Sequence, residues 1–579
     1  MGIPHLTRLL LPYSEAVLLK GGQSAEEGRI HIQSVVIDGP SLVYHVHSRL
    51  LAWSDNRLEF PDMQPSCNEV SCAVMLHLLK LRNLGVDIKA ICFDGALPAR
   101  KRETRLSRLE RARRKLEIAR KSIRYGSLRH NYTPIDTESK LEMILRGRTL
   151  TPKHRECPDN PFMVPAVFED LKHRWNMENI VQAARGSLLL AESAALQDFP
   201  WADVTVMVAG EADMHCAYLA KLTGSAILTN DSDLILHDIG LHGSVVLLHS
   251  LELENTYSAR SIDVPLQAVQ LHPASLAQRF GLADLLPLAY ELKLHPNSGL
   301  TELIRLAKET LGTQGPAGYL EFSEEYKKGP EHAQWGVTDS HHLDPRVSEL
   351  VWQYETQEIN SWDEFPRFYL AILNEDHTRR CAWENGLSYR VLGYSIFNAS
   401  RPPSQRSCFI DEFVRRGGRI ARDTLAIRDA GWIADQMTAF YARLSVVRDA
   451  LGENATTANL WRIFALCEIY GWGDSGSPLP KAKLFSRFLS FGYMCDQTNW
   501  ADIHLTAQVQ AVLYSLRIMR QLIGFTASAN DQLMLKMQDA LMSLPPLHVL
   551  MRSRFEMVKE YLTEDAASEF LKRYKQLAR

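Results

Sequence analysis

The sequence predicts an α/β protein, in which a parallel β-sheet flanked by helices is followed by a mostly α-helical C-terminal region. Short runs rich in Val and Ile alternate with helical patterns over the first 250 residues. Such alternation is typical of a parallel sheet that helices cover on both faces. Beyond about residue 300 the pattern is mostly helical. We therefore expect a first domain over residues 1–300 and a helical region over residues 301–579.

Five short segments, each bounded by turn residues, are expected to be strands. They are Gln33–Ile37, Ile88–Phe93, Val204–Val208, Ser225–Leu228 and Ser244–Leu248. A helical pattern such as Glu69–Leu84 lies between two of them. In the C-terminal region, the segments Gln436–Leu451 and Ala566–Leu577 are predicted to be helices, and Gly471–Pro480 is predicted to be a loop.

Residues 100–124 form a predicted helix with a strongly basic surface. Apolar residues recur there at spacings of three and four, which places them on one helix face: Leu106, Leu109, Ala112, Leu116, Ala119 and Ile123. The same segment holds twelve Lys or Arg residues and only three Glu residues. Its polar face therefore carries a large positive charge.

The composition excludes several classes of protein. Hydrophobic residues make up 46% and charged residues 23%, as in ordinary globular proteins. The net charge of −3 gives no chain-wide signature of nucleic-acid binding, so any basic surface must be local. The nine cysteines form no C-x-x-C pair, which argues against a zinc ribbon and favours reduced thiols. No stretch approaches the roughly 20 apolar residues of a membrane span.

Acidic residues follow four of the predicted strands. Because ligands bind beyond the carboxyl ends of the strands in open parallel sheets, these residues should gather at one edge. The six carboxylates are Asp38, Asp94, Glu211, Asp213, Asp231 and Asp233.

Six carboxylates at one place cannot all ionise without partners, so either their pKa values are raised or cations bind them. Oxygen ligands suit hard cations, and Mg²⁺ or Mn²⁺ fits best. Two such ions can activate water and stabilise the leaving oxygen in phosphodiester hydrolysis. Any single Asp after a strand is more often a turn or helix-capping residue. The repetition of the pattern at four strands favours the metal site.

The basic helix and one tyrosine are candidates for contact with nucleic acid. A charge run is usually a solvated face, but the imbalance here favours contact with phosphates, through residues such as Arg105, Arg111 and Arg114. Tyr44 follows Asp38 on a predicted helix. It is either a core residue or a platform for stacking a nucleobase beside the metals.

These residues resemble a known family. The segments MGIPHLTRLL, VVIDGPSLVY, ICFDG, GEADMHCAYLA and LTNDSDLIL are similar to the flap endonuclease/XPG superfamily. Within it the chain looks most like the asteroid-type branch. The segments at 161–171 (PFMVPAVFEDL) and 375–395 (EDHTRRCAWENGLSYRVLGYS) also resemble that branch.

The resemblance implies a PIN-like fold with two divalent metal ions held by the six acids. It also implies that Lys101 and Arg108 contact the scissile phosphate and act in catalysis, and that Tyr44 stacks a base. Gly2 would lie close to the substrate.

Two departures from the family are visible. The family has a further Asp in a segment that corresponds here to Leu285–Tyr290, where Ala289 takes its place. Asp284 lies five residues earlier on the same predicted helix and should face elsewhere. The Gly-rich helix-hairpin-helix of the family is replaced by HPNSGLTELIRLAK, which lacks the paired glycines.

The sequence therefore predicts a structure-specific nuclease that needs Mg²⁺ or Mn²⁺. It would act on DNA at single-stranded ends or junctions in DNA repair, with RNA as a further possible substrate. We expect a nuclear location, with the cytoplasm as the alternative, and no membrane association. The alternative function is a catalytically weak or inactive nuclease-fold scaffold that binds RNA or proteins in post-transcriptional regulation.

Overall fold

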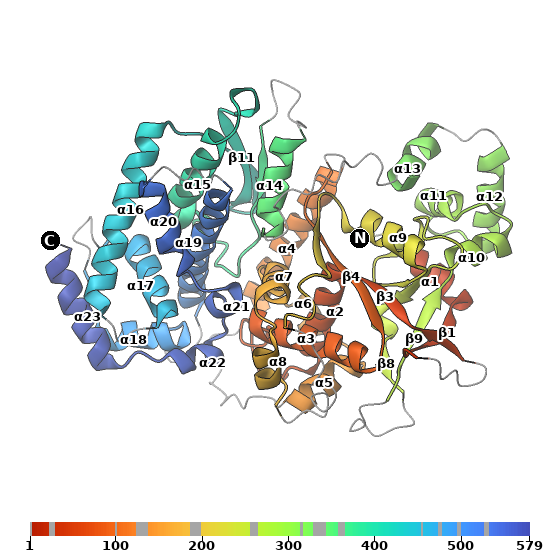
Figure 1. The fold of residues 1–579 in the computed structure, drawn as a ribbon, viewed down its shortest axis with the longest axis horizontal. Helices are drawn as coiled ribbons and strands as arrows, with labels where there is room; N and C mark the ends of the chain where they lie inside the picture. The colour runs from red at the N-terminus through yellow and green to blue at the C-terminus, as the bar shows by residue number, and fades with distance from the viewer. Residues whose placement is uncertain are drawn as a thin grey trace.

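The computed structural model describes residues 3–22, 29–98, 101–122, 137–185, 198–254, 264–312, 317–327, 343–356, 365–452, 456–472, 478–494, 499–525 and 532–578. Figure 1 shows an elongated molecule with a large sheet toward one end and a bundle of helices at the other. The C-terminus lies at the far end of the helical bundle, whereas the N-terminus lies near the middle of the molecule. The predicted α/β fold with a mostly helical C-terminal region is confirmed.

The described strands of the first half form one nine-stranded sheet. Its order is β2-β1-β9-β7-β6-β3-β4-β5, and β8 pairs with β9. The bounds are β1 Glu15–Leu19, β2 Ile30–Ile32, β3 Ser34–Asp38, β4 Asp87–Asp94, β5 Thr205–Val208, β6 Ala226–Thr229, β7 Ser244–Leu247, β8 Glu252–Leu253 and β9 Leu266–Leu271.

All five predicted strands are present, as β3 to β7, and they form the parallel centre of the sheet. The sheet as a whole is mixed, because β9 runs antiparallel to both β7 and β1. Strands β1, β2, β8 and β9 were not predicted from the sequence. These outer strands are short or half-exposed, so they lack the continuous apolar runs of the centre.

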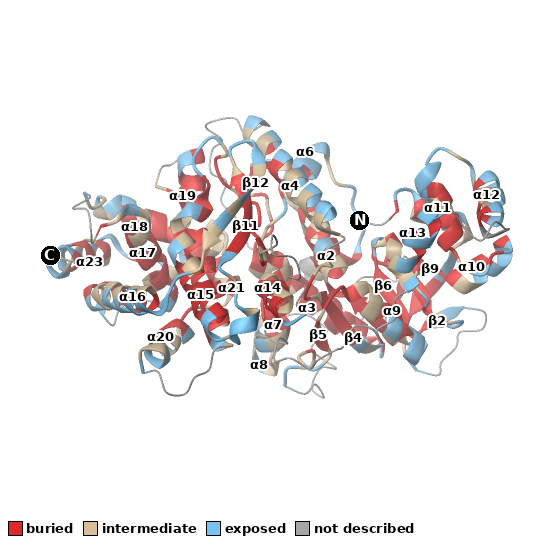
Figure 2. Ribbon diagram, turned by 90° about the horizontal axis from the view of Figure 1, so that it is seen from above, coloured by how far each residue is buried: buried red, intermediate tan, exposed pale blue. Residues whose placement is uncertain are grey.

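Alternate residues of the central strands enter two different cores. Val35 and Ile37 pack under α2 (Gly39–Trp53), α3 (Cys67–Asn83) and α7 (Met163–His173). Val36 faces the opposite core, under α9 (Ala212–Thr223), α10 (Pro273–Phe280) and α11 (Leu286–Leu294). Figure 2 shows these buried layers on the two sides of the sheet. The period of two along a strand thus gives the predicted helix–sheet–helix layering.

The local sequence explains where two of these helices begin. Asp38 caps α2 by accepting a hydrogen bond from the backbone of Ser41, and a proline stands in the first turn. Ser66 and Glu69 form a reciprocal capping box at the start of α3. The first of these caps matters for the site, because the capping residue is also a strand-end carboxylate.

The other helices of the first half lie around this sheet. They are α1 Leu6–Leu10, α5 Thr137–Leu145, α6 Pro152–Glu156, α8 Met177–Ala183, α12 Leu300–Gly312 and α13 Ala317–Lys327. Helices α12 and α13 pack on the same core as α9 and α11, through Leu303, Tyr319 and Phe322. The domain boundary at residues 300/301 stays a prediction.

The predicted basic helix is α4, which spans Arg102–Ser122. The described residues of its predicted apolar face are buried or half-buried, and Leu116 and Ala119 pack with Phe60 of the first half and Trp500 of the C-terminal half. Three residues of the predicted helix, Arg100, Ile123 and Arg124, lie outside the described residues. Helix α4 is therefore enclosed on one side by both halves of the chain.

The described C-terminal half contains ten helices and a three-stranded sheet. The helices are α14 Pro345–Glu355, α15 Leu387–Ala399, α16 Ala430–Leu451, α17 Thr457–Tyr470, α18 Ala482–Phe491, α19 Trp500–Gly524, α20 Gln532–Met542, α21 Leu547–Leu550, α22 Arg554–Met557 and α23 Glu564–Leu577. The two helices predicted here fall within α16 and α23. The sheet, which the sequence analysis missed, has the order β10 Arg367–Tyr369, β11 Phe409–Arg416 and β12 Arg419–Ala426. The predicted loop at residues 471–480 lies partly outside the described residues.

Buried ion pairs hold the C-terminal half together. Arg390 pairs with Glu412 at 2.6 Å, and Glu375 pairs with Arg415 at 2.8 Å, with all four side chains almost fully buried. Arg390 and Glu375 belong to the segment 375–395 that resembles the asteroid-type branch. Arg390 and Glu375 thus lie in ion pairs inside the C-terminal half and do not face a ligand.

The two halves share a core along α7. Phe162 and Ala166 pack within the apolar core of the C-terminal half. The buried Glu169 carboxylate pairs with Arg517 of α19, and it accepts a hydrogen bond of 2.9 Å from the backbone of Leu547. The neighbouring Asp170 accepts a hydrogen bond of 2.6 Å from His548. The segment PFMVPAVFEDL is therefore the joint between the halves.

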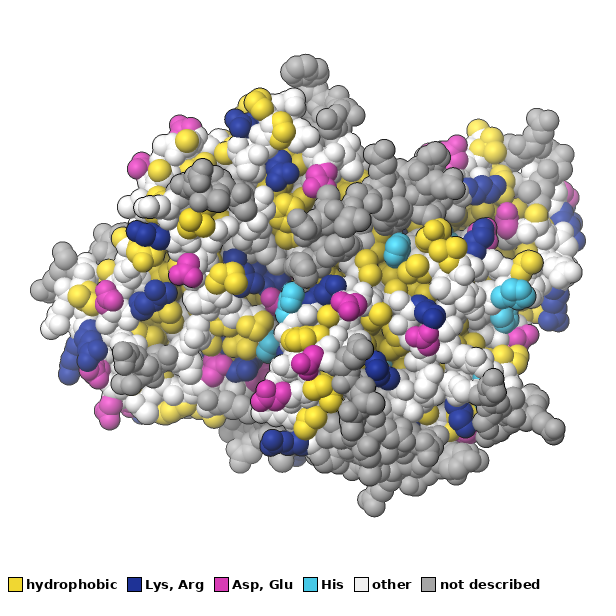
Figure 3. All heavy atoms as spheres, viewed as in Figure 1, with side chains coloured by type: hydrophobic (Ala, Val, Ile, Leu, Met, Phe, Trp, Pro, Cys, Tyr) yellow, Lys and Arg dark blue, Asp and Glu magenta, His cyan; other side chains and the backbone are white. Residues whose placement is uncertain are grey.

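The surface matches the near-zero net charge. On the face seen in Figure 3, basic and acidic side chains are interspersed. The structure contains no disulfide among the eight cysteines that it describes. Within the described ranges, no helix is both long enough and apolar enough to cross a membrane.

Candidate active site

Four neighbouring strands, in the order β6-β3-β4-β5, carry the six predicted acids at their carboxyl ends. Asp38 and Asp94 are the last residues of β3 and β4, two adjacent parallel strands. Glu211 and Asp213 follow β5 at the start of α9, with Glu211 in the capping position. Asp231 and Asp233 follow β6 and span the first turn of a short 3-10 helix. The topology thus places all six at one edge, as predicted.

A buried threonine that the sequence analysis missed links two of the acids. Thr229 ends β6 and donates a hydrogen bond of 2.7 Å to Oδ2 of Asp38. The same hydroxyl accepts a hydrogen bond of 2.9 Å from the backbone N–H of Asp231. Thr229 therefore fixes the spacing between the ends of β3 and β6. Its sequence signal was a polar residue at the end of an apolar strand.

Backbone groups orient the remaining acids. Asp94 accepts a hydrogen bond of 2.8 Å from the N–H of Ala212, in the first turn of α9. Asp231 accepts one of 3.0 Å from the N–H of Asp233. Asp233 in turn accepts one of 3.1 Å from the N–H of Ile3. The start of the chain therefore lies against the acidic edge, although Gly2 itself lies outside the described residues.

Four of the six acids have raised pKa values, because their surroundings disfavour the charged carboxylate. Burial raises the pKa of Asp38 to about 6, and it raises the pKa of Asp94 as well. Burial also raises the pKa of Asp213 well above its usual value, and the charges of Asp231, Asp38 and Asp94 act in the same direction. The pKa of Asp233 rises to about 6 through burial and the charge of Asp231. The charges of these carboxylates thus act on one another's pKa values across the edge of the sheet.

One cation stands among the acids. The ammonium group of Lys101 forms an ion pair with Glu211. Its positive charge also lowers the pKa values of Asp213 and Asp233, against the effect of burial. Lys101 lies immediately before α4, so the start of the basic helix lies next to the acidic edge.

The donor set suits a hard divalent cation, because it consists of carboxylate oxygens in an environment that disfavours their ionisation. Among the described residues, however, no three His, Cys, Asp or Glu side chains form a group arranged to hold a metal ion. The presence of two metal ions stays a prediction.

Some arginines of helix α4 form ion pairs inside the protein, and others are exposed to solvent. Arg105 pairs with Glu349 of α14 at 3.0 Å, and Arg113 is buried between Glu110 and Glu117. Arg108, Arg111 and Arg114 are exposed, and Arg114 also contacts Glu110 at 3.2 Å. The exposed arginines fit the predicted contact with phosphates, whereas Arg105 is engaged inside the protein.

Tyr44 is not a core residue, because half of its surface is exposed. Its surroundings nevertheless raise the pKa of its hydroxyl through burial, and the positive charges of Arg346, Arg108 and Arg105 oppose this effect. Arg108 and Arg105 also act on the pKa of Asp94. The charge of Arg108 thus acts on both Tyr44 and Asp94.

The C-terminal half contributes α14 to this region, which the sequence analysis did not foresee. A side chain at Gly95, directly after Asp94, would come within 2.9 Å of the Ser348 hydroxyl. The buried Glu349 has a raised pKa, because burial and the charge of Asp94 outweigh its contact with Arg105. Helix α14 therefore packs closely against the loop after β4.

Tyr326 of α13 is a second residue that the sequence analysis missed. Burial raises the pKa of its hydroxyl, and the charges of Asp233 and Asp231 act in the same direction. Its ring contacts His237 at a centroid distance of 5.3 Å. Nothing in the local sequence around residue 326 predicts this position, because it depends on how α13 packs on the core under α9 and α11.

Ala289, which stands where the family has an aspartate, has apolar surroundings. Ala289 is fully buried in the core beneath α11. The expectation that Asp284 stands on the same helix was wrong. Helix α11 begins at Leu286, and the Asp284 carboxylate accepts a hydrogen bond of 2.9 Å from the backbone of that residue. A carboxylate at 289 would thus lie among apolar side chains, which costs free energy unless a cation is bound.

One comparison with known proteins matches a part of the chain that carries four of the six acids. Residues 159–427 match a protein-family model described as XPG domain containing, which covers just under half of the chain. The matched segment includes the acids from Glu211 to Asp233 and helix α14. The match supports the XPG/flap endonuclease superfamily and a nuclease-type fold. A search of curated proteins found no match.

Proposed function

We propose that this protein is a structure-specific, Mg²⁺- or Mn²⁺-dependent DNA nuclease of the asteroid-type branch. It would act at single-stranded ends or junctions in nuclear DNA repair, and RNA is a further possible substrate. The observation that carries the proposal is the gathering of six acids at the ends of four adjacent strands, with Lys101 among them. The XPG match over part of the same site supports it.

The residues have separate roles in this proposal. The six acids would hold two divalent ions, which supply an activated water and charge stabilisation when bound. Lys101 and Arg108 offset the charge that develops on the scissile phosphate. Tyr44 presents an exposed ring for stacking beside them. Thr229 fixes the relative positions of Asp38 and Asp231.

A nuclease assay with the full chain tests the proposal. We expect Mg²⁺ or Mn²⁺ to support cleavage of single-stranded, overhang or flap DNA, and chelation to stop it. Fully paired DNA is the control, and RNA strands test the breadth of the substrate range. A protein inert on every substrate at high metal concentration would contradict a nuclease function.

The second candidate function is a nuclease-fold scaffold that binds RNA or proteins. Two observations favour it: Ala289 replaces an expected carboxylate, and Lys101 pairs directly with Glu211. Binding of RNA or protein without cleavage in the assay above would support this function instead.

Lys101→Ala is expected to reduce turnover far more than affinity. The ammonium group acts mainly on the charge of the transition state, so we expect turnover at saturating metal to fall by roughly a hundredfold. Affinity for a single strand should change by only a few fold. Lys121→Ala is the matched control, because Lys121 lies at the other end of α4 with its side chain 74% exposed. An equal loss of turnover and affinity would mean that Lys101 only binds substrate.

A further inference from the structure

The C-terminal half contacts the basic helix α4 near both of its ends. Near the start of α4, Arg105 forms an ion pair of 3.0 Å with Glu349 of α14. Near its end, Arg120 forms an ion pair of 2.8 Å with Asp376, in the segment between β10 and α15. The two arginines lie roughly 22 Å apart along the helix axis, at 1.5 Å per residue. The C-terminal half thus holds α4 at two well-separated points.

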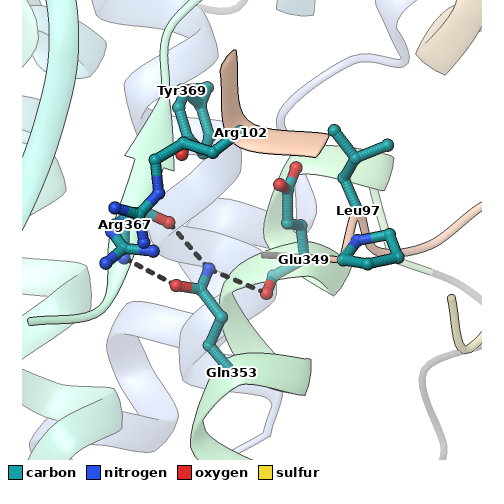
Figure 4. A pocket seen from close by; sticks show the side chains of 7 residues that line it. Leu97, Arg102, Glu349, Gln353, Arg367 and Tyr369 are labelled. Atoms are coloured by element: carbon teal, nitrogen blue, oxygen red, sulfur yellow. Dashed lines mark hydrogen bonds between the residues drawn. The ribbon is translucent and has the colours of Figure 1, made fainter. Parts of the chain in front are cut away.

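The first of these contacts encloses the guanidinium group of Arg105. This group donates a hydrogen bond of 3.0 Å to the carboxylate of Glu349, which is buried. It also lies 5.5 Å from the centre of the Tyr369 ring, which in turn stacks on Phe413. Figure 4 shows Glu349 reaching from α14 toward the start of α4, with Tyr369 beside that helix. Because a buried carboxylate is costly without its cation, this ion pair resists separation.

Helix α14 is itself fixed within the C-terminal half. Gln353, one turn after Glu349, donates hydrogen bonds of 3.0 Å to the Glu349 carbonyl oxygen and 2.9 Å to the carbonyl oxygen of Arg367 in β10, as Figure 4 shows. At the start of α14, Asp344 accepts a hydrogen bond of 2.7 Å from the hydroxyl of Tyr514 in α19. Glu349 therefore presents its carboxylate to α4 from a fixed support.

The second contact fixes the far end of α4. The buried Asp376 accepts hydrogen bonds of 3.1 Å from the backbone of Thr378 and 2.8 Å from its hydroxyl. Arg120 donates a hydrogen bond of 3.4 Å to the same hydroxyl, and its guanidinium lies 5.9 Å from the centre of the Trp500 ring. One point of contact would leave a helix able to tilt, whereas two points set the direction of its axis.

The position of α4 determines the position of Lys101. Lys101 directly precedes α4 and lies one turn before Arg105. Its ammonium group forms the ion pair with Glu211 at the acidic edge. A displacement of the first turn of α4 would therefore move Lys101 away from the acids.

We propose that the C-terminal half positions Lys101 at the acidic edge by holding α4 near both ends, with Glu349 and Asp376 as the positioning residues. The inference rests on the proposed nuclease function and gives the C-terminal half a role at that same site. A displacement of about 1 Å in a catalytic group can cost up to about a hundredfold in rate. The Glu349 contact lies closer to Lys101, so it should contribute more than the Asp376 contact.

Chemical labelling of lysines tests the position of Lys101 without any cleavage. The full chain is treated with an amine-reactive acylating reagent, and mass spectrometry gives the rate at each lysine. Although burial opposes it, the charge of Glu211 raises the pKa of the Lys101 ammonium, so the paired group should react slowly. Glu349→Ala should speed labelling of Lys101 by about tenfold, which corresponds to a fall of one pKa unit. The buried Lys80 and the exposed Lys121 are internal controls and should keep their wild-type rates.

Turnover shows whether Glu349 acts through Lys101. In single-turnover cleavage at saturating metal, Glu349→Ala should be about tenfold slower, while affinity changes by only a few fold. The double variant Lys101→Ala/Glu349→Ala should be no slower than Lys101→Ala alone, because independent effects would multiply. Glu349→Gln should retain most of the turnover, since its amide oxygen can still accept the hydrogen bond from Arg105. Glu355→Ala, at the exposed end of α14, is the matched control and should behave as wild type.

Two results would overturn the positioning role. One is unchanged labelling of Lys101 in Glu349→Ala, and the other is a double variant whose losses of turnover multiply. Faster labelling of Lys80 would reveal a loosened fold; Arg105→Ala then breaks the same ion pair from α4 and should speed labelling of Lys101 alone. Faster labelling of Lys101 in a protein inert on every nucleic acid would support the positioning of Lys101 and contradict the nuclease function.

Discussion

Asp231→Asn is expected to remove cleavage while it leaves affinity for nucleic acid equal or higher. Asp231 follows β6, and its charge raises the pKa values of Asp213 and Asp233. Loss of a group that only supports a metal ligand costs up to about a hundredfold in metal affinity or activity. Loss of a direct ligand should exceed that in turnover. Removal of a negative charge that faces phosphate should not weaken binding.

The substitution is conservative for the fold, because the side-chain oxygen of Asn can still accept the hydrogen bond from Asp233. Cleavage is measured under single-turnover conditions across a metal titration, and affinity is measured on the same strand. Asp238→Asn is the control, since Asp238 follows closely in sequence but pairs with Lys221 on the surface, with its side chain 72% exposed. Full activity of the Asp231 variant would show that this carboxylate is not needed for cleavage.

Asp38→Asn is expected to stabilise the metal-free protein at neutral pH by up to about 3 kcal/mol. Burial raises the pKa of Asp38 from 3.8 to about 6, and one pKa unit corresponds to about 1.4 kcal/mol. Between these two values the folded state holds the proton more tightly than the unfolded state. Stability therefore falls as pH rises through this window, and the full penalty is present above pH 6. The Asn variant carries no such charge.

Denaturant unfolding at several pH values checks this prediction. The difference between variant and wild type should be largest at pH 7.5 and should vanish only well below pH 3.8, where the carboxyl is protonated in both the folded and the unfolded state. Mg²⁺ should reverse the order, because it stabilises the wild type by binding the folded state. Asp87→Asn is the control, since Asp87 begins the same β4 strand with its side chain 59% exposed. A stability difference that does not depend on pH would show that Asp38 is mainly a capping residue.

The centre of the fold could be predicted from sequence, whereas the outer strands could not. The strands β3 to β7 are buried on both faces, so their apolar runs are continuous and carry a local signal. By contrast, β9 alternates buried and half-buried residues, and it pairs with a strand about 250 residues away in the chain. Such pairing depends on long-range contacts that local patterns do not contain.

Some residues of the candidate site could also be predicted from the sequence, and others could not. The six acids could be located because each follows a recognisable strand. Glu349 and Tyr326 could not, because they come from helices that reach the site only through packing of later parts of the chain. The apolar face of α4 could be predicted from its spacing, but its partner Trp500 could not. Sequence patterns thus located the acids and did not locate the residues that surround them.

The contacts of α7 with the C-terminal half predict how truncation of the chain affects its stability. Glu169 is buried, and its carboxylate is matched by Arg517, which lies almost 350 residues later in the chain. A transcript that ended between these codons would leave Glu169 without its cation and Phe162 without its apolar neighbours. Removal of one partner of a buried pair costs about 3–5 kcal/mol, a large part of the stability of a typical domain. Premature stop codons that lie after Asp233, the last of the six acids, but before Arg517 should therefore act as null alleles.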